Sequence, residues 1–377
     1  MAPFKPTSTR AAIATSKKPD DTQGLVGSIK STMASTRAKL RLLKGQHQPK
    51  MIKSNPKPKH VSTLYKILKQ VTEDLAAQDA AAADDAELLN SDSDSHIDRS
   101  LLPARSDLNI SHFETSSQLG RGKFGHVFLA RHRTTNYICA LKILCKAQIA
   151  GGEEEILIRR ELEIHQNLAH PNILRFLSWF HDEARIYLVL EYAPGGTLFE
   201  RLKREPKGRF NERVAAQYVA QMAEALKYMH DKNVMHRDIK PENILLGLHD
   251  EIKLADFGYS VHSVSGLRAT VCGTLDYISP EVALLLAQPG KKKESYTKAV
   301  DRWSLGVLTY ELLVGKPPFE MKSRKATEKK IANFRGRVLF PSYVSQGAMD
   351  FILELLNLNA DERMSLEDVL AHPWIRD

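Results

Sequence analysis

Two short motifs contain residues that could transfer a phosphoryl group. HRDIKPEN occupies residues 236–243, and DFG occupies residues 256–258. Asp238 can accept the proton of an attacking hydroxyl and orient it. Lys240, two residues later, is placed to steady the γ-phosphate of a nucleotide. This acid and this lysine together predict phosphoryl transfer to a hydroxyl group.

The same motifs supply candidate ligands for a metal ion. Asp256 and Asn243 offer a carboxylate and an amide oxygen, and Mg²⁺ prefers hard oxygen ligands together with water and phosphate. A metal there would neutralise charge shared between the β and γ phosphates of ATP. We therefore expect ATP and Mg²⁺ as cofactors. Any one of these residues alone could be structural, so the prediction depends on the ordered set.

A glycine-rich segment precedes these motifs. Gly120, Gly122 and Gly125 form G-x-G-x-x-G, whose backbone amides can approach phosphates closely. Dinucleotide-binding folds share this pattern, but they require an acidic residue about 20 positions further on to bind the ribose. Residues 131–150 contain no Asp or Glu, and instead place Lys142 in the strand-like CALKIL. A glycine hairpin followed by such a lysine is the protein kinase arrangement.

Lys142 needs a carboxylate to hold it over the phosphates, and Glu161 on the helical stretch EEEILIRRELEIHQNL is the predicted ion-pair partner. In IYLVLEYAPGG, a buried strand runs into a break that suits a hinge between two lobes. Its backbone near Glu191 and Ala193 could hydrogen-bond an adenine, with Leu190 at the back of the pocket. The full set expected to contact ATP is Leu119, Gly120, Arg121, Gly122, Lys123, Phe124, Gly125, His126, Val127, Ala140, Lys142, Glu161, Leu190, Glu191, Ala193, Glu242, Asn243 and Asp256.

Residues 113–377 resemble the eukaryotic protein kinase domain, and more closely the Aurora kinases. LGRGKFGHVFLAR, HPNILRF, LEYAPGGT, HRDIKPENILLG, CGTLDY, WSLGVLTYELLVGKPPFE and HPWI all look like that family. The resemblance implies an α+β, bilobal kinase fold, with a β-rich N-lobe over 113–192 and a helical C-lobe over 193–377. It also implies a non-specific serine/threonine protein kinase, for which Lys240 is typical, and a mitotic role in chromosome segregation.

The sequence departs from the family pattern at several places. Tyr259 follows DFG where Aurora kinases usually have Trp, and residues 279–281 read Ser-Pro-Glu instead of Ala-Pro-Glu. Residues 284–299 form a longer, lysine-rich insertion that we expect to be a surface loop. His165, one helical turn after Glu161, sits where Aurora kinases carry Gln.

Three further residues match structural positions of kinase C-lobes. Glu281 and Arg363 are expected to form a buried ion pair. Asp301, in VDRWSLG, is expected to hold the backbone of the catalytic loop from a helix beneath it.

The stretch GLRATVCGT contains a candidate switch. A phosphate on Thr270 would add about −1.5 to −2 charge and could make one to three charge-assisted hydrogen bonds. Arg237, beside the predicted base, and Arg160, beside Glu161, are the candidate receivers. The alternative interpretation of Thr270 is a polar turn.

Substrate choice is predicted from residues around the same segment. The hydroxyl of Thr274 is expected to bridge Asp238 and Lys240. Glu242 and Glu311 match positions that bind arginine before the target residue, although both could be ordinary surface acids. They predict substrates with Arg or Lys two or three residues before Ser/Thr, a pattern that Thr270 itself fits.

Residues 1–112 differ in composition from the rest and are predicted to be largely disordered. Residues 1–60 hold 13 Lys and Arg and 2 Asp and Glu, whereas residues 61–112 hold 4 and 10. We expect a basic segment over 1–60, an amphipathic helix over 62–82 and an acidic linker over 83–112. The basic segment is either a solvated tail or a contact for DNA or microtubules.

Cellular context follows partly from composition and partly from the resemblance. Cys139, Cys145 and Cys272 are few and unpatterned, which predicts reduced thiols, and no window is apolar over the roughly 18 residues of a membrane span. The resemblance implies nuclear, centromere, kinetochore and spindle locations, with substrates such as histone tails and kinetochore proteins.

The regulatory partner is predicted from one residue and from the resemblance. Ser178 lies where the animal Aurora forms differ according to their activator, and it matches neither common choice. The preferred partners are the inner-centromere scaffold and other chromosomal passenger subunits. The alternatives are a spindle-type Aurora, another kinase branch, or a pseudokinase scaffold that only binds partners.

Overall fold

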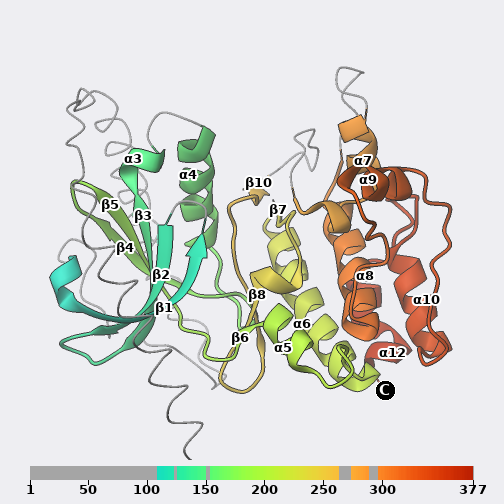
Figure 1. Ribbon diagram of the computed structural model, residues 1–377, viewed down its shortest axis with the longest axis horizontal. Coiled ribbons are helices and arrows are strands. Elements are labelled where there is room, and N and C mark those ends of the chain that lie inside the picture. The colour runs from blue at the N-terminus through green and yellow to red at the C-terminus, as the bar shows by residue number, and fades with distance from the viewer. Residues whose placement is uncertain (1–107, 123–124, 150–152, 263–272, 288–295, 377) are drawn as a thin grey trace, which may run out of the picture. The chain divides into compact units, whose positions relative to one another are not determined.

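The structure is a computed structural model that describes residues 108–122, 125–149, 153–262, 273–287 and 296–376. Its first part is an antiparallel sheet of order β1-β2-β3-β5-β4 (Figure 1). The sheet is followed along the chain by helices that form the second part. The expected segments 1–60 and 62–82, and nearly all of the linker 83–112, lie outside the described residues. The elements of the first part are η4 (Ile110–His112), β1 (Phe113–Gly122), β2 (Gly125–His132), β3 (Ile138–Cys145), α3 (Lys146–Ile149), α4 (Glu153–His165), β4 (Phe176–His181) and β5 (Arg185–Leu190).

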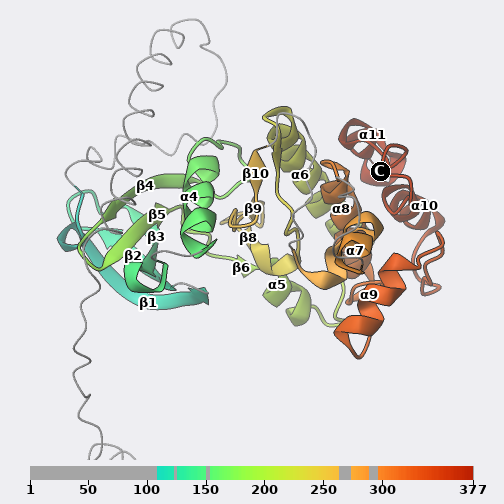
Figure 2. The same ribbon diagram turned by 90° about the horizontal axis from the view of Figure 1, so that it is seen from above.

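Both faces of this sheet are apolar. Along β5, Leu188 and Leu190 belong to a cluster that also contains Ile158 and Leu162 of α4. Val189, between them, belongs to a second cluster on the opposite face, as the two-residue period of a strand requires. The first cluster fixes α4 against the sheet, and Figure 2 shows α4 between the sheet and β10. Leu108 packs into the second cluster, so the described packing begins before residue 113.

Helices make up most of the second part, and α8 is at its centre. Nearly every residue of α8 is buried, and α6 and α10 pack against it, as expected for a helix that is apolar around most of its circumference. No described helix is long and apolar enough to cross a membrane. The helices are α5 (Leu198–Arg204), α6 (Glu212–Asp231), α7 (Pro280–Ala287), α8 (Ala299–Val314), α9 (Arg324–Ala332), α10 (Gln346–Leu355), α11 (Leu366–Ala371) and α12 (Pro373–Arg376).

Short strands position the motifs between the two parts. The expected HRD and KPEN residues lie between β7 and β8, and DFG lies between β9 and β10. β8 pairs with β9 and with β6, and β10 pairs with β7, so each motif is fixed at both ends by a ladder. These elements are β6 (Gly196–Thr197), β7 (Val234–Met235), η5 (Pro241–Asn243), β8 (Ile244–Leu246), β9 (Ile252–Leu254), β10 (Val261–His262) and η6 (Leu275–Tyr277).

The predicted ion pair between Glu281 and Arg363 is present. Arg363 is 1% exposed, and its two terminal nitrogens donate to the two carboxylate oxygens of Glu281 at 3.0 and 3.2 Å. The guanidinium also donates to the carbonyls of Ala299 and Asn357. This arrangement joins the start of α7 to α8 and to the segment before α11.

We predict that Glu281→Ala lowers the free energy of unfolding by about 3 kcal/mol or more, because it leaves a buried guanidinium without its counter-charge. Denaturant unfolding of the full chain measures this. The matched control is Asp231→Ala, which removes an exposed partner of Lys227 at 3.2 Å and should cost less than about 1 kcal/mol. Equal losses for the two variants would show that the buried pair contributes little.

Candidate active site

Lys142 and Glu161 form an ion pair beside the DFG segment. β3 places Lys142 and α4 places Glu161, and Lys142 Nζ lies 2.5 Å from Glu161 Oε1. Both line a cavity of about 130 Å³, together with Asp256, Gly122 and Gly258. The cavity therefore collects the glycine hairpin, the lysine, its partner and the DFG acid, as the sequence predicts.

Charges around Lys142 keep it protonated. Burial alone would lower the pKa of the Lys142 ammonium. The charges of Glu161 and Asp256, with the hydrogen bond to Glu161, outweigh that effect and raise the pKa above its ordinary value. A permanent cation therefore faces the cavity from the N-lobe side.

The carboxylate of Asp238 is surrounded by donors. Its Oδ1 accepts from the backbone N–H of Thr274 at 3.0 Å and from the Thr274 hydroxyl at 2.8 Å. Its Oδ2 accepts from Lys240 Nζ at 2.7 Å and from Asn243 Nδ2 at 2.8 Å. Burial alone would raise the pKa of Asp238, but the Lys240 ammonium and the Thr274 hydroxyl hold it below its ordinary value. Lys240 also donates to the Thr274 hydroxyl at 2.8 Å, which is the predicted bridge.

Asp301 fixes the backbone that carries Asp238. Its side chain has no exposure to water, and it accepts from the backbone N–H groups of His236 and Arg237, both at 2.9 Å. Arg237 has a φ of 69°, in the left-handed region. Close packing adds a second constraint, because a Cβ on Gly273 would lie 2.6 Å from the Arg237 carbonyl oxygen. The predicted support from beneath the catalytic loop is present.

An apolar cluster joins the sheet to the second part. It contains Val127, Ala140, Leu190 and Ala193, four of the residues expected to contact ATP. The same cluster contains Leu245 of β8, which was not among the expected ATP contacts. Leu245 follows KPEN by two residues, so the motif itself offered the signal. Apolar side chains from both parts would suit the faces of an aromatic ring.

Comparison with known proteins agrees with this geometry. Residues 113–375 match the protein kinase domain family. Aurora kinase of Schizosaccharomyces pombe is 52% identical over 274 residues, which cover 72% of this chain and 74% of that protein. Aurora kinase C of Mus musculus is 48% identical over 273 residues, which cover 72% of this chain and 95% of that protein. The chain belongs to the Aurora family of serine/threonine protein kinases.

The family match does not extend over the whole of every relative. Aurora kinase A-A of Xenopus laevis is 48% identical over 266 residues, which cover 71% of this chain but 62% of that protein, less than two thirds.

The fold expected of the family is confirmed, with a sheet-rich N-lobe and a helical C-lobe.

The glycine hairpin of this Aurora-family kinase is closed by pairing of Gly122 with Gly125 between β1 and β2. A Cβ on Gly125 would lie 1.8 Å from the Ile143 carbonyl oxygen, so the neighbouring strand excludes any side chain there. Leu119, on the same hairpin, is 43% exposed. Of the other predicted contacts on this hairpin, Arg121 is exposed and His126 half-buried, whereas Lys123 and Phe124 lie outside the described residues.

Glu191 has a side-chain role in addition to its predicted backbone role. Its carboxylate lies 2.8 Å from Lys253 Nζ on β9 and accepts from the Arg175 backbone N–H at 2.9 Å. The hinge is thereby tied to the C-lobe. Lys253 was not predicted, because nothing local to β9 indicates a partner more than sixty residues earlier in the chain.

Of the predicted switch, the structure describes the arginines but not Thr270. Arg237 donates from Nε to the Tyr259 carbonyl at 2.7 Å and from Nη1 to the Tyr296 hydroxyl at 2.8 Å. Arg160 is half-buried on α4 and forms no ion pair with described acids. Tyr296 comes from the predicted 284–299 insertion, so part of that insertion packs against the catalytic loop. Residues 288–295 lie outside the described residues.

The two predicted substrate acids differ in environment. Glu242 is exposed, whereas Glu311 is 6% exposed and accepts from the Tyr277 hydroxyl. Burial, together with the charges of Glu242, Glu320 and Asp276, raises the pKa of Glu311 to about 8. The ordinary surface acid considered for Glu311 is therefore not what the structure shows.

His165, one of the departures from the family, contacts the DFG phenylalanine. Its ring centroid lies 4.4 Å from that of Phe257, and Nε2–H donates to the Leu174 carbonyl at 2.6 Å. His236 contacts Phe257 from another direction, at 5.3 Å. Burial is the main cause of a pKa of about 4 for His165; the charges of Lys142 and His236 also lower it, whereas the Leu174 carbonyl and Asp256 oppose the shift. A neutral histidine thus links α4, the segment before β4 and DFG.

We predict that His165→Gln reduces the loss of stability on acidification. A histidine with a pKa of about 6.5 unfolded and about 4 folded binds more protons when unfolded, so stability falls as pH drops from 6.5 towards 4. At pH 5 this group should cost about 2 kcal/mol. Thermal unfolding of wild type and variant at pH 7.5 and pH 5 measures the difference. The exposed His249→Gln is the control, and identical acid losses in His165→Gln and wild type would refute the interpretation.

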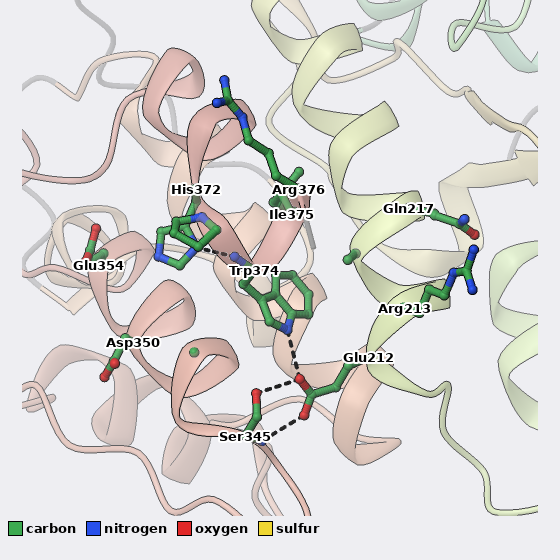
Figure 3. A pocket seen from close by; sticks show the side chains of 13 residues that line it. Glu212, Arg213, Gln217, Ser345, Asp350, Glu354, His372, Trp374, Ile375 and Arg376 are labelled. Carbon is green, nitrogen blue, oxygen red and sulfur yellow. Dashed lines mark hydrogen bonds between the residues drawn. The ribbon is translucent and has the colours of Figure 1, made fainter.

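A larger hollow of about 820 Å³ lies far from these residues along the chain, at the start of α6 and around α12 (Figure 3). There Glu212 accepts from the backbone N–H and hydroxyl of Ser345 and from Trp374 Nε1. These bonds tie α12 and α10 to α6. None of the predicted catalytic residues lines this hollow.

Proposed function

We propose that this chain transfers the γ-phosphoryl group of ATP to Ser/Thr hydroxyls in basic sequence contexts, with the residues predicted from its motifs. The observation that carries the proposal is the double placement of charge. Lys142, paired with Glu161, lines the same cavity as Asp256. Asp238, in the motif that precedes DFG along the chain, is held as a carboxylate by its donors.

The donors present fit a magnesium nucleotide. The side-chain nitrogen of Asn243 donates to the backbone carbonyl of Asp238 and to its Oδ2. The side-chain oxygen of Asn243 is then left for a cation. Asp256 is exposed, and its Oδ1 accepts only a 3.3 Å bond from Gly258 N–H among the described contacts. No group of three His, Cys, Asp or Glu gathers among the described residues. Mg²⁺ held by two protein oxygens, phosphates and water agrees with that.

In the proposed reaction, the oxygen of the substrate hydroxyl bonds to the γ-phosphorus, and Asp238 accepts the proton that this hydroxyl loses. The bond from that phosphorus to the β–γ bridging oxygen breaks, and ADP leaves. Bound Mg²⁺ would neutralise charge on the β and γ phosphates. Lys142 and Lys240 supply further fixed positive charge, and Thr274 orients both Lys240 and the base.

The function is tested by turnover of the full chain on a peptide with Arg two residues before Ser. We predict that Asp256→Asn lowers turnover by about 10²-fold or more, because a charged metal ligand is lost. Asp231→Asn, an exposed acid on α6, should keep wild-type turnover. If wild type and Asp256→Asn were equally inactive, the chain would instead be a scaffold that only binds partners.

Thr270 is proposed as the activating phosphosite, and Arg237 and Arg160 would bind the phosphate on it. Thr270→Ala should lower turnover more than about tenfold, since charge-assisted hydrogen bonds contribute about 1.5–3 kcal/mol each. The KM for ATP should stay nearly unchanged. Ser263→Ala, in the same segment, is the control. Full activity of Thr270→Ala would return this residue to a polar turn.

Substrate preference is proposed to depend on Glu242 and Glu311. Because the pKa of Glu311 is about 8, its carboxyl is mostly neutral at pH 7 and mostly charged at pH 9. We predict that preference for an Arg-containing peptide over its Gln counterpart, as a ratio of kcat/KM, rises by up to about tenfold over that range. Glu311→Gln should flatten the profile. Parallel profiles for wild type and variant would contradict this role.

We also propose a mitotic role for this kinase, in chromosome segregation at the centromere, kinetochore and spindle, with the inner-centromere scaffold and passenger subunits as partners. The family membership supports it. Ser178 is 3% exposed, so any influence on activator choice would act through packing of β4. Purification of the full chain from mitotic cells tests the partner. Recovery of a spindle-assembly activator without passenger subunits would overturn this choice.

A further inference from the structure

A basic groove of about 920 Å³ borders helix α9 on the C-lobe, at a distance along the chain from the catalytic motifs. We call it the α9 groove. One acidic residue, Glu320, lines it. Its five cations are all exposed: Lys316, Lys322, Lys330, Arg335 and Arg337.

Among the described residues, these cations have no acidic partner. No ion pair joins any of the five to an acid within the described ranges. Two of them are instead fixed by backbone carbonyls: Lys330 donates to Pro318 at 2.8 Å, and Arg335 donates to Phe334 at 3.0 Å. Clustered like charges lining a concave surface raise the local potential and attract a polyanion.

The lining of the groove is also apolar. Leu339 is 91% exposed and Met321 is 49% exposed, and Pro317 also lines the groove. Burying the exposed leucine and methionine side chains on docking is favourable. A phosphodiester backbone cannot make apolar contacts with these side chains. An acidic peptide with large apolar residues matches both the charge and the apolar surface of the groove.

We propose that the α9 groove binds the chain's own acidic segment, residues 84–98, DDAELLNSDSDSHID. This segment carries six acids and no Lys or Arg, and Leu88 and Leu89 lie among the acids. The nineteen residues from Leu89 to the first described residue, Leu108, can span up to roughly 65 Å. A compact domain of this size is roughly 50 Å across, so residues 84–89, with three acids and both leucines, can reach the groove, and residues 90–98 would form the path to it.

The test is zero-length carbodiimide coupling of carboxylates to lysines in the dilute full chain at physiological salt, with linked peptides identified by mass spectrometry. The expected links join Asp84, Asp85 or Glu87 to Lys316 or Lys330. In the triple variant Lys322→Gln, Arg335→Gln, Arg337→Gln, both reporter lysines remain, and their links to residues 84–98 should fall at least about fivefold as the attraction is removed. The matched control, Lys203→Gln, Arg204→Gln, Lys207→Gln, removes three exposed cations of α5 and its following turn and should leave the yield unchanged.

The apolar contribution is measured separately. Leu88→Ser with Leu89→Ser keeps every charge, and the proposal requires it to lower the same links at least about threefold, by loss of apolar burial. An unchanged crosslink yield in this variant would mean that the groove attracts the segment by charge alone, without specificity. That result would contradict the proposal.

Other occupants give distinct results, each of which overturns the proposal. Links from residues 84–98 only to lysines of the basic segment 1–60 would place the acids on the tail. Links found only between ¹⁴N- and ¹⁵N-labelled copies would assign the groove to a second molecule. No links, with DNA binding lost in the triple groove variant, would assign it to nucleic acid. The expected links should persist in the Asp256→Asn chain, so this proposal and the catalytic one fail independently.

Discussion

The carboxylate of Asp301 is the constraint on which the catalytic loop depends. It has no contact with water, and it accepts hydrogen bonds from the His236 and Arg237 backbone and from His230 Nε2 at 2.8 Å. Burial alone would raise its pKa, yet the hydrogen bond and charge of His230 hold the pKa below the ordinary value. A buried anion with its donors in place resists any movement of those donors, because a displaced donor would leave the charge uncompensated. The backbone that turns through Arg237 is thereby fixed before Asp238 is reached.

From that fixed turn, contacts extend to both lobes. Arg237 reaches the segment after DFG through the Tyr259 carbonyl and the helical lobe through Tyr296. His236 and His165 contact the DFG phenylalanine, and His165 also lies one helical turn after Glu161. The pairing of Lys142 with Glu161 is therefore coupled by packing to the loop that carries the base. A displacement of α4 would therefore shift DFG, and a displacement of DFG would shift the catalytic loop.

Much of the site was predictable because its residues lie in short motifs with fixed roles. The pairs Lys142–Glu161 and Glu281–Arg363, and the Asp238–Thr274–Lys240 bridge, all followed from such motifs. Other contacts had no local signal. The burial of Glu311 results from packing of α8 against Tyr277, and the Tyr296 contact comes from a stretch expected to be only a surface loop. Such contacts join segments far apart in sequence, and neither periodicity nor spacing reports them.

The dependence on Asp301 is tested most directly by Asp301→Asn, which keeps the side-chain shape but replaces one acceptor oxygen with a donor. The measurement is turnover on the Arg-containing peptide, at a temperature where circular dichroism shows the variant folded. We predict a loss of about 10²-fold or more, since small displacements of a catalytic group cost that much, with the KM for ATP nearly unchanged. A folded variant with turnover within about threefold of wild type would contradict the account.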